Sequence, residues 1–214
     1  QVMGQTHNDI RNDLEAPPKI NLNTIMQFIS RPSWCLNMMT AKKLNFGNIM
    51  GHVTNVTNLS SLASWTADQF DPTLTWEDIA WIKDRWKGKL ILKGIMDSED
   101  AMLAVKAGAD AIIISNHGGR QLDGAPSTIS VLPEIVDAVN SKVEVHFDGG
   151  VRSGQDVLKA LALGADCIHI GRPYVYGLGA KGQEGVEIAI EIIKKELDLT
   201  MAMCGETNIS NVGL

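Results

Sequence analysis

His117 and Arg120 lie three residues apart in a short segment that also contains two consecutive glycines. An imidazole can take a proton near neutral pH, and a guanidinium group can hold a carboxylate through two parallel hydrogen bonds. Glycine has no side chain and lets a small ligand approach the backbone. The segment therefore carries groups that could remove a proton from a small carboxylic acid, although such a loop is also compatible with a purely structural role.

Two later segments combine glycine and arginine in front of an expected helix. They are Asp148-Gly149-Gly150-Val151-Arg152 and Gly171-Arg172. The glycines allow backbone N–H groups to approach a ligand, and the start of a helix attracts anions. Arg152 and Arg172 would add charged hydrogen bonds, so we expect a phosphate here. No GxGxxG pattern is present, which disfavours a Rossmann dinucleotide site.

Each of these segments follows a short run rich in Ile, Val and Leu. The runs cover residues 89–93, 110–115, 143–148 and 166–171. Nearly continuous apolar runs are typical of parallel strands that are buried on both faces. Lys93 ends the first run, so parallel pairing would bring it to the same edge as His117 and the two arginines. Four such strands fit either a doubly wound sheet or half of a (β/α)8 barrel.

Helical patterns separate the apolar runs. We expect helices that open at Thr75, at Ser98, near residues 126–127, at Ser153 and at Pro173, and a last helix over residues 183–203. Asp78 stands three residues after Thr75, the spacing of a capping box. The alternation of strand and helix predicts an α/β fold with a parallel sheet.

The composition excludes several classes of protein. Among 214 residues the net charge is −6, which disfavours a nucleic-acid surface. Three cysteines occur without a CxxC pair, so we expect reduced thiols, no disulfide framework and no metal site. No apolar run reaches the roughly 18 residues of a membrane span, and no signal peptide is recognisable. These features predict a cytoplasmic protein, and the opening on Gln1 leads us to expect further sequence before it.

Residues 1–72 are less regular than the rest of the chain. A periodic stretch over residues 23–39 is broken at Pro32, and a polar segment over residues 40–66 follows it. A connection of this length is usually functional or mobile. We expect residues 40–72 to form an inserted segment that serves as an active-site lid or faces a membrane.

The segment Ser115–Gly124, SNHGGRQLDG, resembles the signature of the FMN-dependent 2-hydroxy acid dehydrogenases and oxidases. Further stretches that are similar to this family are GQTHNDIRN, LKGI, DGGVRSGQDVLKALALGA and IGRPYVYGLGAKGQEGV. They extend over nearly the whole chain, 1–214. The resemblance implies the C-terminal half of a (β/α)8 barrel, with about four βα units, that binds FMN.

The resemblance also implies a role for each site residue. His117 would be the base that removes a proton from the substrate, and Arg120 would bind its carboxylate. Lys93 would stabilise negative charge at the N1/O2 edge of the flavin, and Ser115 would contact the flavin ring. The ribityl chain and phosphate of FMN would be bound by Asp148, Gly149, Gly150, Arg152, Gly171 and Arg172.

For function, the resemblance favours oxidation of an (S)-2-hydroxy acid, with L-lactate to pyruvate as the leading reaction. The alternatives are an oxidase that uses oxygen on glycolate or a related acid, and an FMN-binding fragment without activity. The electron acceptor would be a quinone, a cytochrome or oxygen. The protein could form a homo-oligomer and lie peripherally on the inner face of the plasma membrane.

The chain departs from the family pattern in two respects. Thr6 stands where the family has an arginine that faces the substrate, and the loss of such a cation would weaken catalysis by about 2–4 kcal/mol. The first four barrel strands are also missing, so we expect this chain alone to be inactive until the complementary half is supplied. His146 and His169 fall inside expected strands, where we expect core histidines with a local hydrogen bond.

Overall fold

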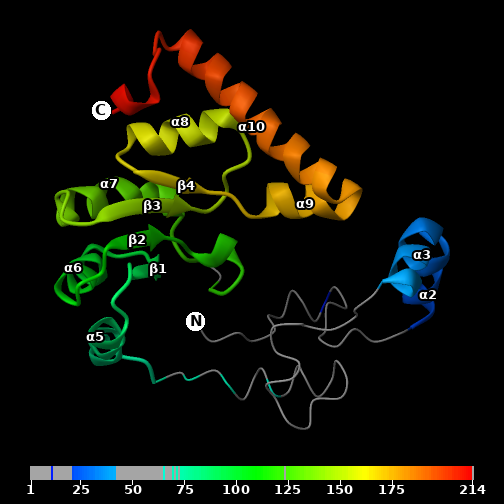
Figure 1. The fold of residues 1–214 in the computed structure, drawn as a ribbon, viewed down its shortest axis with the longest axis horizontal. Coiled ribbons are helices and arrows are strands. Elements are labelled where there is room, and N and C mark those ends of the chain that lie inside the picture. The colour runs from blue at the N-terminus through cyan, green and yellow to red at the C-terminus, as the bar shows by residue number, and fades with distance from the viewer. Residues whose placement is uncertain are drawn as a thin grey trace. The chain divides into compact units, whose positions relative to one another are not determined.

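The computed structural model describes residues 11, 21–41, 65, 69, 71, 73–122 and 124–213. The chain divides into two compact units, Gln1–Thr73 and Leu74–Leu214 (Figure 1). The second unit contains the sheet and all the site residues that the structure describes.

The sheet of the second unit has four parallel strands in sequential order. They are β1 (Ile91–Ile95), β2 (Ala111–Ile114), β3 (Glu144–Asp148) and β4 (Cys167–His169). A doubly wound sheet reverses its strand order at a switch point, and this sheet has no reversal. The order therefore confirms the prediction of consecutive βα units of a (β/α)8 barrel.

The strands lie within two residues of the expected runs, with one shift that matters. The first run was expected to end at Lys93, whereas β1 continues to Ile95. The pairing register with β2 slips between Lys93 and Ile95, where Gly94 adopts a φ of 101°. This irregularity next to Lys93 replaces the simple strand end that the apolar pattern suggested.

Helices cover the sheet where the sequence predicts them. They are α5 (Trp76–Arg85), α6 (Ser98–Lys106), α7 (Thr128–Val139), α8 (Gly154–Ala162), α9 (Arg172–Lys181) and α10 (Gln183–Met203), and a short turn η2 (Ile209–Asn211) follows. The predicted capping box at Thr75 opens α5, and α8 opens at Ser153 as predicted, with a capping box that was not predicted. The cap of α6 is Asp97 rather than Ser98, because the Asp97 carboxylate accepts the N–H groups at the helix start.

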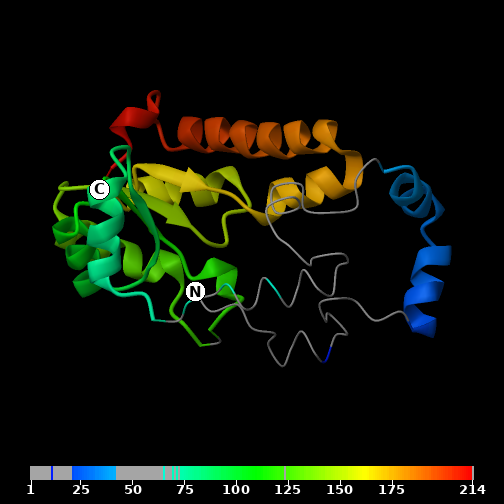
Figure 2. The same ribbon diagram turned by 60° about the horizontal axis from the view of Figure 1, so that its bottom comes forward.

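The core lies between the sheet and its covering helices. Its fully buried side chains include Ile112 and Ile114 from β2 with Leu132, Ile135 and Val139 from α7. Helix α10 runs along the outside of α8 and α9 (Figure 2). Helices α8 and α10 approach so closely that a Cβ on Gly154 would lie 1.9 Å from the backbone nitrogen of Leu197. This packing of helices on the sheet fixes each βα unit. The carboxyl end of its strand remains available for a site.

The first unit contains a pair of short helices, α2 (Leu22–Ile29) and α3 (Pro32–Thr40). Asn21 caps α2, and Pro32 stands at the first position of α3, which explains the interruption of the periodic stretch. Phe28 and Trp34 stack with ring centroids 5.5 Å apart. Neither helix has a buried residue. The expected insertion at 40–72 lies mostly outside the described residues, and within them no helix is long and apolar enough to cross a membrane.

Candidate active site

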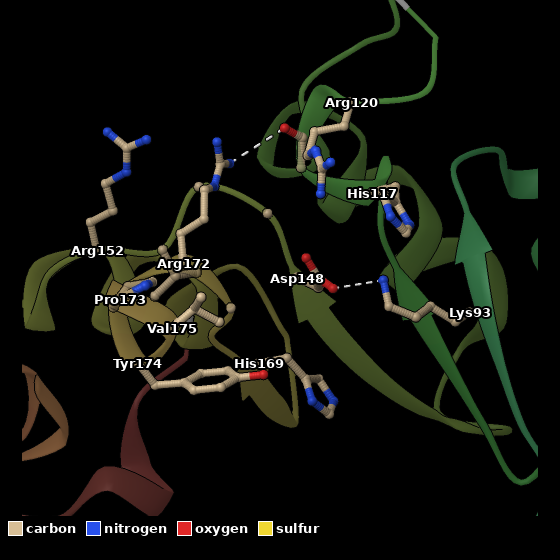
Figure 3. A pocket seen from close by; sticks show the side chains of 15 residues that line it. Lys93, His117, Arg120, Asp148, Arg152, His169, Arg172, Pro173, Tyr174 and Val175 are labelled. Atoms are coloured by element: carbon tan, nitrogen blue, oxygen red, sulfur yellow. Dashed lines mark hydrogen bonds and ion pairs between the residues drawn. The ribbon is translucent and has the colours of Figure 1, made fainter. Parts of the chain in front are cut away.

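A cavity of about 440 Å³ lies at the carboxyl ends of the four strands (Figure 3). Nine of the ten residues that the sequence singled out line it. They are Lys93, His117, Arg120, Asp148, Gly149, Gly150, Arg152, Gly171 and Arg172. The tenth, Ser115, is buried directly behind the wall and contacts Lys93. The cavity is also lined by six residues that were not predicted as site residues: Gly118, Val151, His169, Pro173, Tyr174 and Val175.

Lys93 is held at the centre of the cavity by neighbours from two other strands. Its Nζ lies 2.7 Å from Oδ2 of Asp148 and donates a hydrogen bond of 2.5 Å to Oγ of Ser115. The side chain of Lys93 is nearly half exposed, so its charge still faces the cavity. The sequence assigned Asp148 to a bound ribityl chain, and the structure adds a role for it as the partner of Lys93.

The segment that carries His117 is a tight turn with unusual backbone angles. His117 opens the short 3-10 turn η1 (His117–Gly119), and its φ of 58° is rare for a residue with a side chain. Gly118 and Gly119 continue this left-handed geometry with φ of 68° and 72°. Asn116 closes the turn by accepting the N–H of Gly119 and donating to the carbonyl of Pro126.

This turn presents His117 and Arg120 to the same side of the cavity (Figure 3). The backbone N–H of His117 donates to Oγ of Ser115, which ties the turn to the support of Lys93. In the part of the chain that the structure describes, no side chain forms a hydrogen bond with the imidazole of His117. None of the described side chains would therefore have to release the ring before it contacts a ligand in the cavity.

Arg172 links the His117 turn to the opposite wall. Its Nη2 donates a hydrogen bond of 3.4 Å to the carbonyl of Gly118 (Figure 3). A Cβ at Gly118 would lie 3.2 Å from the same nitrogen, so glycine leaves the space that this contact needs. The guanidinium group retains further N–H donors for a ligand.

The two helix starts at the cavity differ in the donors that they offer. At α8, the N–H groups of Arg152 and Ser153 donate to Asp156, and that of Gly154 donates to Glu196. Burial raises the pKa of Asp156, but these hydrogen bonds outweigh it and the pKa is lowered, so the carboxylate stays charged. At α9, Gly171 provides no side-chain cap. The start of α9 therefore suits an anion better than the start of α8. The sequence had predicted phosphate contacts at both.

The charges around the cavity are strongly one-sided. Among the described residues that line the cavity, Asp148 is the one carboxylate. The same lining contains four cationic side chains, those of Lys93, Arg120, Arg152 and Arg172. Among the described residues, none of the three arginines forms an ion pair with a carboxylate. The cavity is consequently suited to a ligand with more than one negative charge.

His169 lines the floor of the cavity and was expected only as a core residue. Burial, and then the neighbouring His146, lower its pKa, so its imidazole stays neutral near neutral pH. The expected local hydrogen bond is confirmed: Nδ1 of His146 lies 3.1 Å from Nε2 of His169. His146 is 8% exposed, whereas His169 is only partly buried. Thr6, where the sequence predicts a lost cation, lies outside the described residues.

Comparison with known proteins gives this arrangement a context. The protein family described as FMN-dependent dehydrogenase matches residues 1–213. Curated relatives include L-lactate dehydrogenases of Vibrio cholerae serotype O1, 40% identical over 212 residues, and of Allorhizobium ampelinum, 41% identical over 212 residues. Each alignment covers 99% of this chain and 56% of the relative, so the chain spans about half the length of these relatives.

Two solved structures that this chain resembles are described as a mandelate dehydrogenase and a mandelate oxidase. A monotopic membrane protein, (S)-mandelate dehydrogenase, is 34% identical with a TM-score of 0.88 over 96% of this chain and 54% of its own. A mandelate oxidase with (S)-4-hydroxymandelic acid is 46% identical with a TM-score of 0.67 over 72% of this chain and 43% of its own.

Proposed function

This chain belongs to the FMN-dependent dehydrogenase family, and on that premise we propose that its cavity holds FMN and serves the oxidation of an (S)-2-hydroxy acid, with L-lactate as the substrate. The observation that carries the proposal is the gathering of Lys93, His117, Arg120 and Arg172 around one cavity at the strand ends. The site provides cations for a phosphate and for a carboxylate, and a free imidazole for a proton.

The residues present fit FMN in size and charge. The cavity of about 440 Å³ lies within the usual range for sites of small ligands and cofactors. Gly149 and Gly150, with φ of 125° and 76°, form a wall without side chains where a cofactor can lie against the backbone. Arg172, Arg152 and the uncapped start of α9 would hold the phosphate, and Lys93 would face the flavin ring. When bound, FMN supplies the chemistry that accepts two electrons from the substrate.

The remaining groups fit a 2-hydroxy acid. Arg120 would hold the carboxylate in a fixed orientation through its planar fork of donors. The imidazole of His117 would accept a proton as the hydroxy acid becomes a 2-oxo acid. Lys93, fixed by Asp148 and Ser115, keeps a positive charge beside the place where negative charge develops. The strained φ of His117 would aim the ring at the substrate.

The choice of L-lactate is supported by the curated relatives, which are L-lactate dehydrogenases at 40–41% identity. Mandelate dehydrogenase and oxidase are the competing precedents. The purified chain, combined with the complementary half of the barrel that activity is expected to require and loaded with FMN, should therefore be mixed anaerobically with L-lactate, glycolate and (S)-mandelate. We expect flavin absorbance to be lost fastest with L-lactate, and H117Q to slow this loss by at least about 100-fold. Rapid reduction by (S)-mandelate alone, or by none of these acids, contradicts the proposal.

The reduced protein then distinguishes the electron acceptors. We propose a quinone or a similar carrier, in keeping with the dehydrogenase relatives. A short-chain quinone should restore the oxidised flavin spectrum faster than air-saturated buffer does. The opposite order of rates identifies an oxidase.

We also propose that the protein binds a membrane surface through its first unit. Leu22, Met26 and Ile29 lie on one face of α2 and are 83%, 64% and 68% exposed. Such a stripe favours insertion at a lipid interface. The related (S)-mandelate dehydrogenase is described as a monotopic membrane protein.

Sedimentation with phosphatidylcholine–phosphatidylglycerol vesicles tests this localisation. The triple variant L22E/M26E/I29E should remain in the supernatant. A matched triple variant on the exposed side of α10, I188E/I192E/L199E, should sediment as the wild type does. Equal sedimentation of wild type and the α2 variant removes α2 as the membrane contact.

A further inference from the structure

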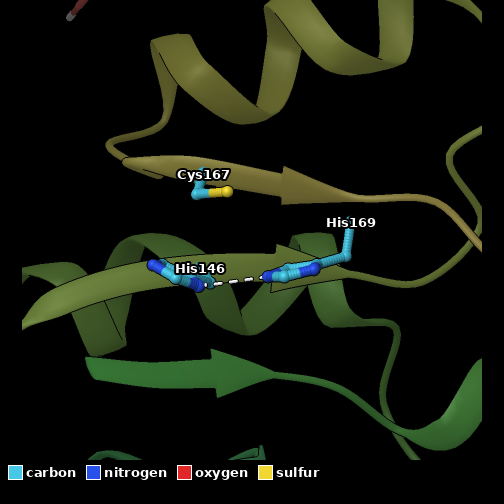
Figure 4. Close-up of side chains that lie close together, drawn as sticks. All are labelled: His146, Cys167 and His169. Carbon is cyan, nitrogen blue, oxygen red and sulfur yellow. Dashed lines mark hydrogen bonds between the residues drawn. The ribbon is translucent and has the colours of Figure 1, made fainter. Parts of the chain in front are cut away.

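Three side chains to which the proposed function assigns no role come together on one face of β3 and β4. His146, Cys167 and His169 each offer one ligand atom, and these atoms all lie within 4.8 Å of one another (Figure 4). In the strand register Cys167 pairs with His146, and His169 pairs with Asp148 two residues further along each strand. Alternation along the strands thus directs all three side chains to the same face.

From this geometry we propose a metal site for a borderline-soft divalent ion such as Zn²⁺, with Nδ1 of His146, Nε2 of His169 and Sγ of Cys167 as ligands. Two imidazoles and one thiolate are donors that zinc prefers. At the usual zinc bond lengths, tetrahedral ligands stand about 3.3–3.6 Å from one another. The two imidazole nitrogens are already 3.1 Å apart. Rotation of the Cys167 and His169 side chains can complete the arrangement.

The surroundings of His146 support this assignment independently. Its second ring nitrogen, Nε2, lies 3.2 Å from Oε2 of Glu144. A metal-bound imidazole commonly donates its other N–H to a carboxylate, which fixes the tautomer and the direction of the lone pair. The Glu144 contact would therefore leave the lone pair of Nδ1 directed toward His169. His146 then needs no change of tautomer when a metal binds, whereas His169, which would donate from Nε2 to Nδ1 of His146 in the metal-free pair, would carry its proton on Nδ1 instead.

The neighbouring charges allow a dication at this place. Lys93 carries a positive charge that acts on His169, and Asp148 holds its ammonium group at 2.7 Å. Binding releases one proton, because Cys167 must enter the site as a thiolate while both imidazoles bind in their neutral forms. His169 also lines the cavity, so the fourth coordination position opens toward it and can take a water molecule.

Cobalt titration of the full chain, first freed of metal by a chelator and kept reduced, tests the proposal with Co²⁺ itself as the probe. We expect one equivalent of Co²⁺ to produce a thiolate-to-cobalt charge-transfer band and the strong visible bands of a tetrahedral site. Added Zn²⁺ should remove both. C167S should lose the charge-transfer band, and H169L should weaken binding by at least about 100-fold.

Two matched controls separate this site from accidental thiol binding. Cys35 and Cys204 are the other free cysteines, and C35S and C204S should keep the full cobalt spectrum. E144Q should retain the spectrum but weaken Co²⁺ affinity by about 10–100-fold.

X-ray absorption on the zinc-loaded wild type keeps the test independent of variant folding. Two nitrogen scatterers and one sulfur scatterer are expected, besides any light atom from water. The proposal is overturned if the wild-type chain gives no cobalt bands, or if the charge-transfer band persists in C167S. His146 and His169 would then be a hydrogen-bonded pair only. Neither readout depends on flavin or activity, so the outcome is separate from that of the proposed function.

Discussion

Arg172 is the residue on which the phosphate assignment depends most. It is partly buried, contacts the carbonyl of Gly118 and stands at the start of α9, whereas Arg152 is exposed. A charged hydrogen bond of this kind contributes about 1.5–3 kcal/mol. R172A should therefore weaken FMN binding by roughly 10–100-fold, measured by quenching of flavin fluorescence. R152A should have a smaller effect because water screens its charge.

R85A is the matched control for this prediction. Arg85 stacks on the ring of Trp81, with its guanidinium carbon 4.1 Å from the ring centre, and does not line the cavity. Its removal should leave FMN affinity unchanged. Equal affinities of R172A and the wild type would exclude Arg172 as a phosphate ligand.

Gly149 gives a prediction about stability. Its φ of 125° is unfavourable for any side chain, and a Cβ would lie 2.5 Å from Oγ1 of the buried Thr128. G149A should lower the free energy of unfolding by about 1–3 kcal/mol in urea. The double variant G149A/T128A should recover the unfolding free energy that G149A loses through the clash with Thr128. It should not recover the free energy lost through the unfavourable φ.

Gly179 provides the comparison for that substitution. It lies within α9, and no atom stands within 4 Å of its added Cβ. Alanine is favoured over glycine in a helix by about 0.5–1 kcal/mol, so G179A should be neutral or stabilising. If G149A is as stable as G179A, the backbone at Gly149 is less constrained than its φ indicates.

At the residue scale, much of the site is readable from sequence because the chemistry is concentrated in short loops. His117, Arg120, Arg152 and Arg172 stand beside glycines at the ends of apolar runs, and that context identifies them. The pairing of Lys93 with Asp148 is not readable, because it joins two strands that are separated by another strand. The gathering of His146, Cys167 and His169 escapes for the same reason: it depends on the register of β3 against β4.

At the scale of elements, Asp110 joins a helix to two strands. It precedes β2, accepts the N–H of Leu90 and forms ion pairs with Lys83 of α5 at 2.6 Å and with Lys89 at 2.9 Å. The hydrogen bond from Lys83, followed by those from Leu90 and Lys89, holds the pKa of Asp110 well below its ordinary value. This carboxylate therefore stabilises the attachment of α5 to the sheet only while it is charged.

The sign of the pH effect follows from that lowered pKa. The contribution of Asp110 is complete above its unfolded pKa of about 3.9 and is lost as the pH falls toward the folded value. D110N should be less stable than the wild type at pH 7, and the difference should shrink progressively as the pH falls below about 4, measured by urea unfolding. D84N is the control, since Asp84 forms only an exposed pair with Lys87. A difference that persists at acid pH contradicts the assignment.

Element boundaries are predicted well where a cap defines them and less well elsewhere. Thr75 and Ser153 open helices because their side chains and those of Asp78 and Asp156 satisfy the free N–H groups. Ser98 is not the cap of α6, because Asp97, one residue earlier, accepts the N–H groups of Glu99 and Asp100. The slip in β1 at Gly94 has no sequence signal beyond the glycine itself.

At the scale of the whole molecule, strand order is the feature that the apolar pattern by itself left open, and only the family resemblance predicted the half-barrel. Apolar runs and helices establish a parallel sheet but not which strands are neighbours, and both barrel and doubly wound architectures remained. The sequential order resolves this choice because every strand pairs with the next along the chain. It also explains the site, since all four strand ends contribute to one cavity.

A cavity built from four consecutive βα units should couple cofactor binding to global stability. With free FMN at about 100 times its dissociation constant, the stabilisation is about 2.7 kcal/mol, which corresponds to a rise in melting temperature of roughly 5–10 °C. Riboflavin lacks the phosphate and should bind about 10–100-fold more weakly. At the same concentration it should stabilise by only about 0.4–1.4 kcal/mol.

R172A makes this comparison specific, because it should reduce the FMN shift toward that of riboflavin and leave the riboflavin shift unchanged. R85A should keep both wild-type shifts. Differential scanning fluorimetry with each ligand measures all four cases. Equal shifts for FMN and riboflavin would mean that the arginines and the start of α9 do not bind the phosphate, and no shift with either ligand would mean that the cavity does not hold a flavin. Cofactor binding is expected to raise stability because the residues that would bind the cofactor lie on separate βα units. A bound phosphate and flavin ring would hold these units together.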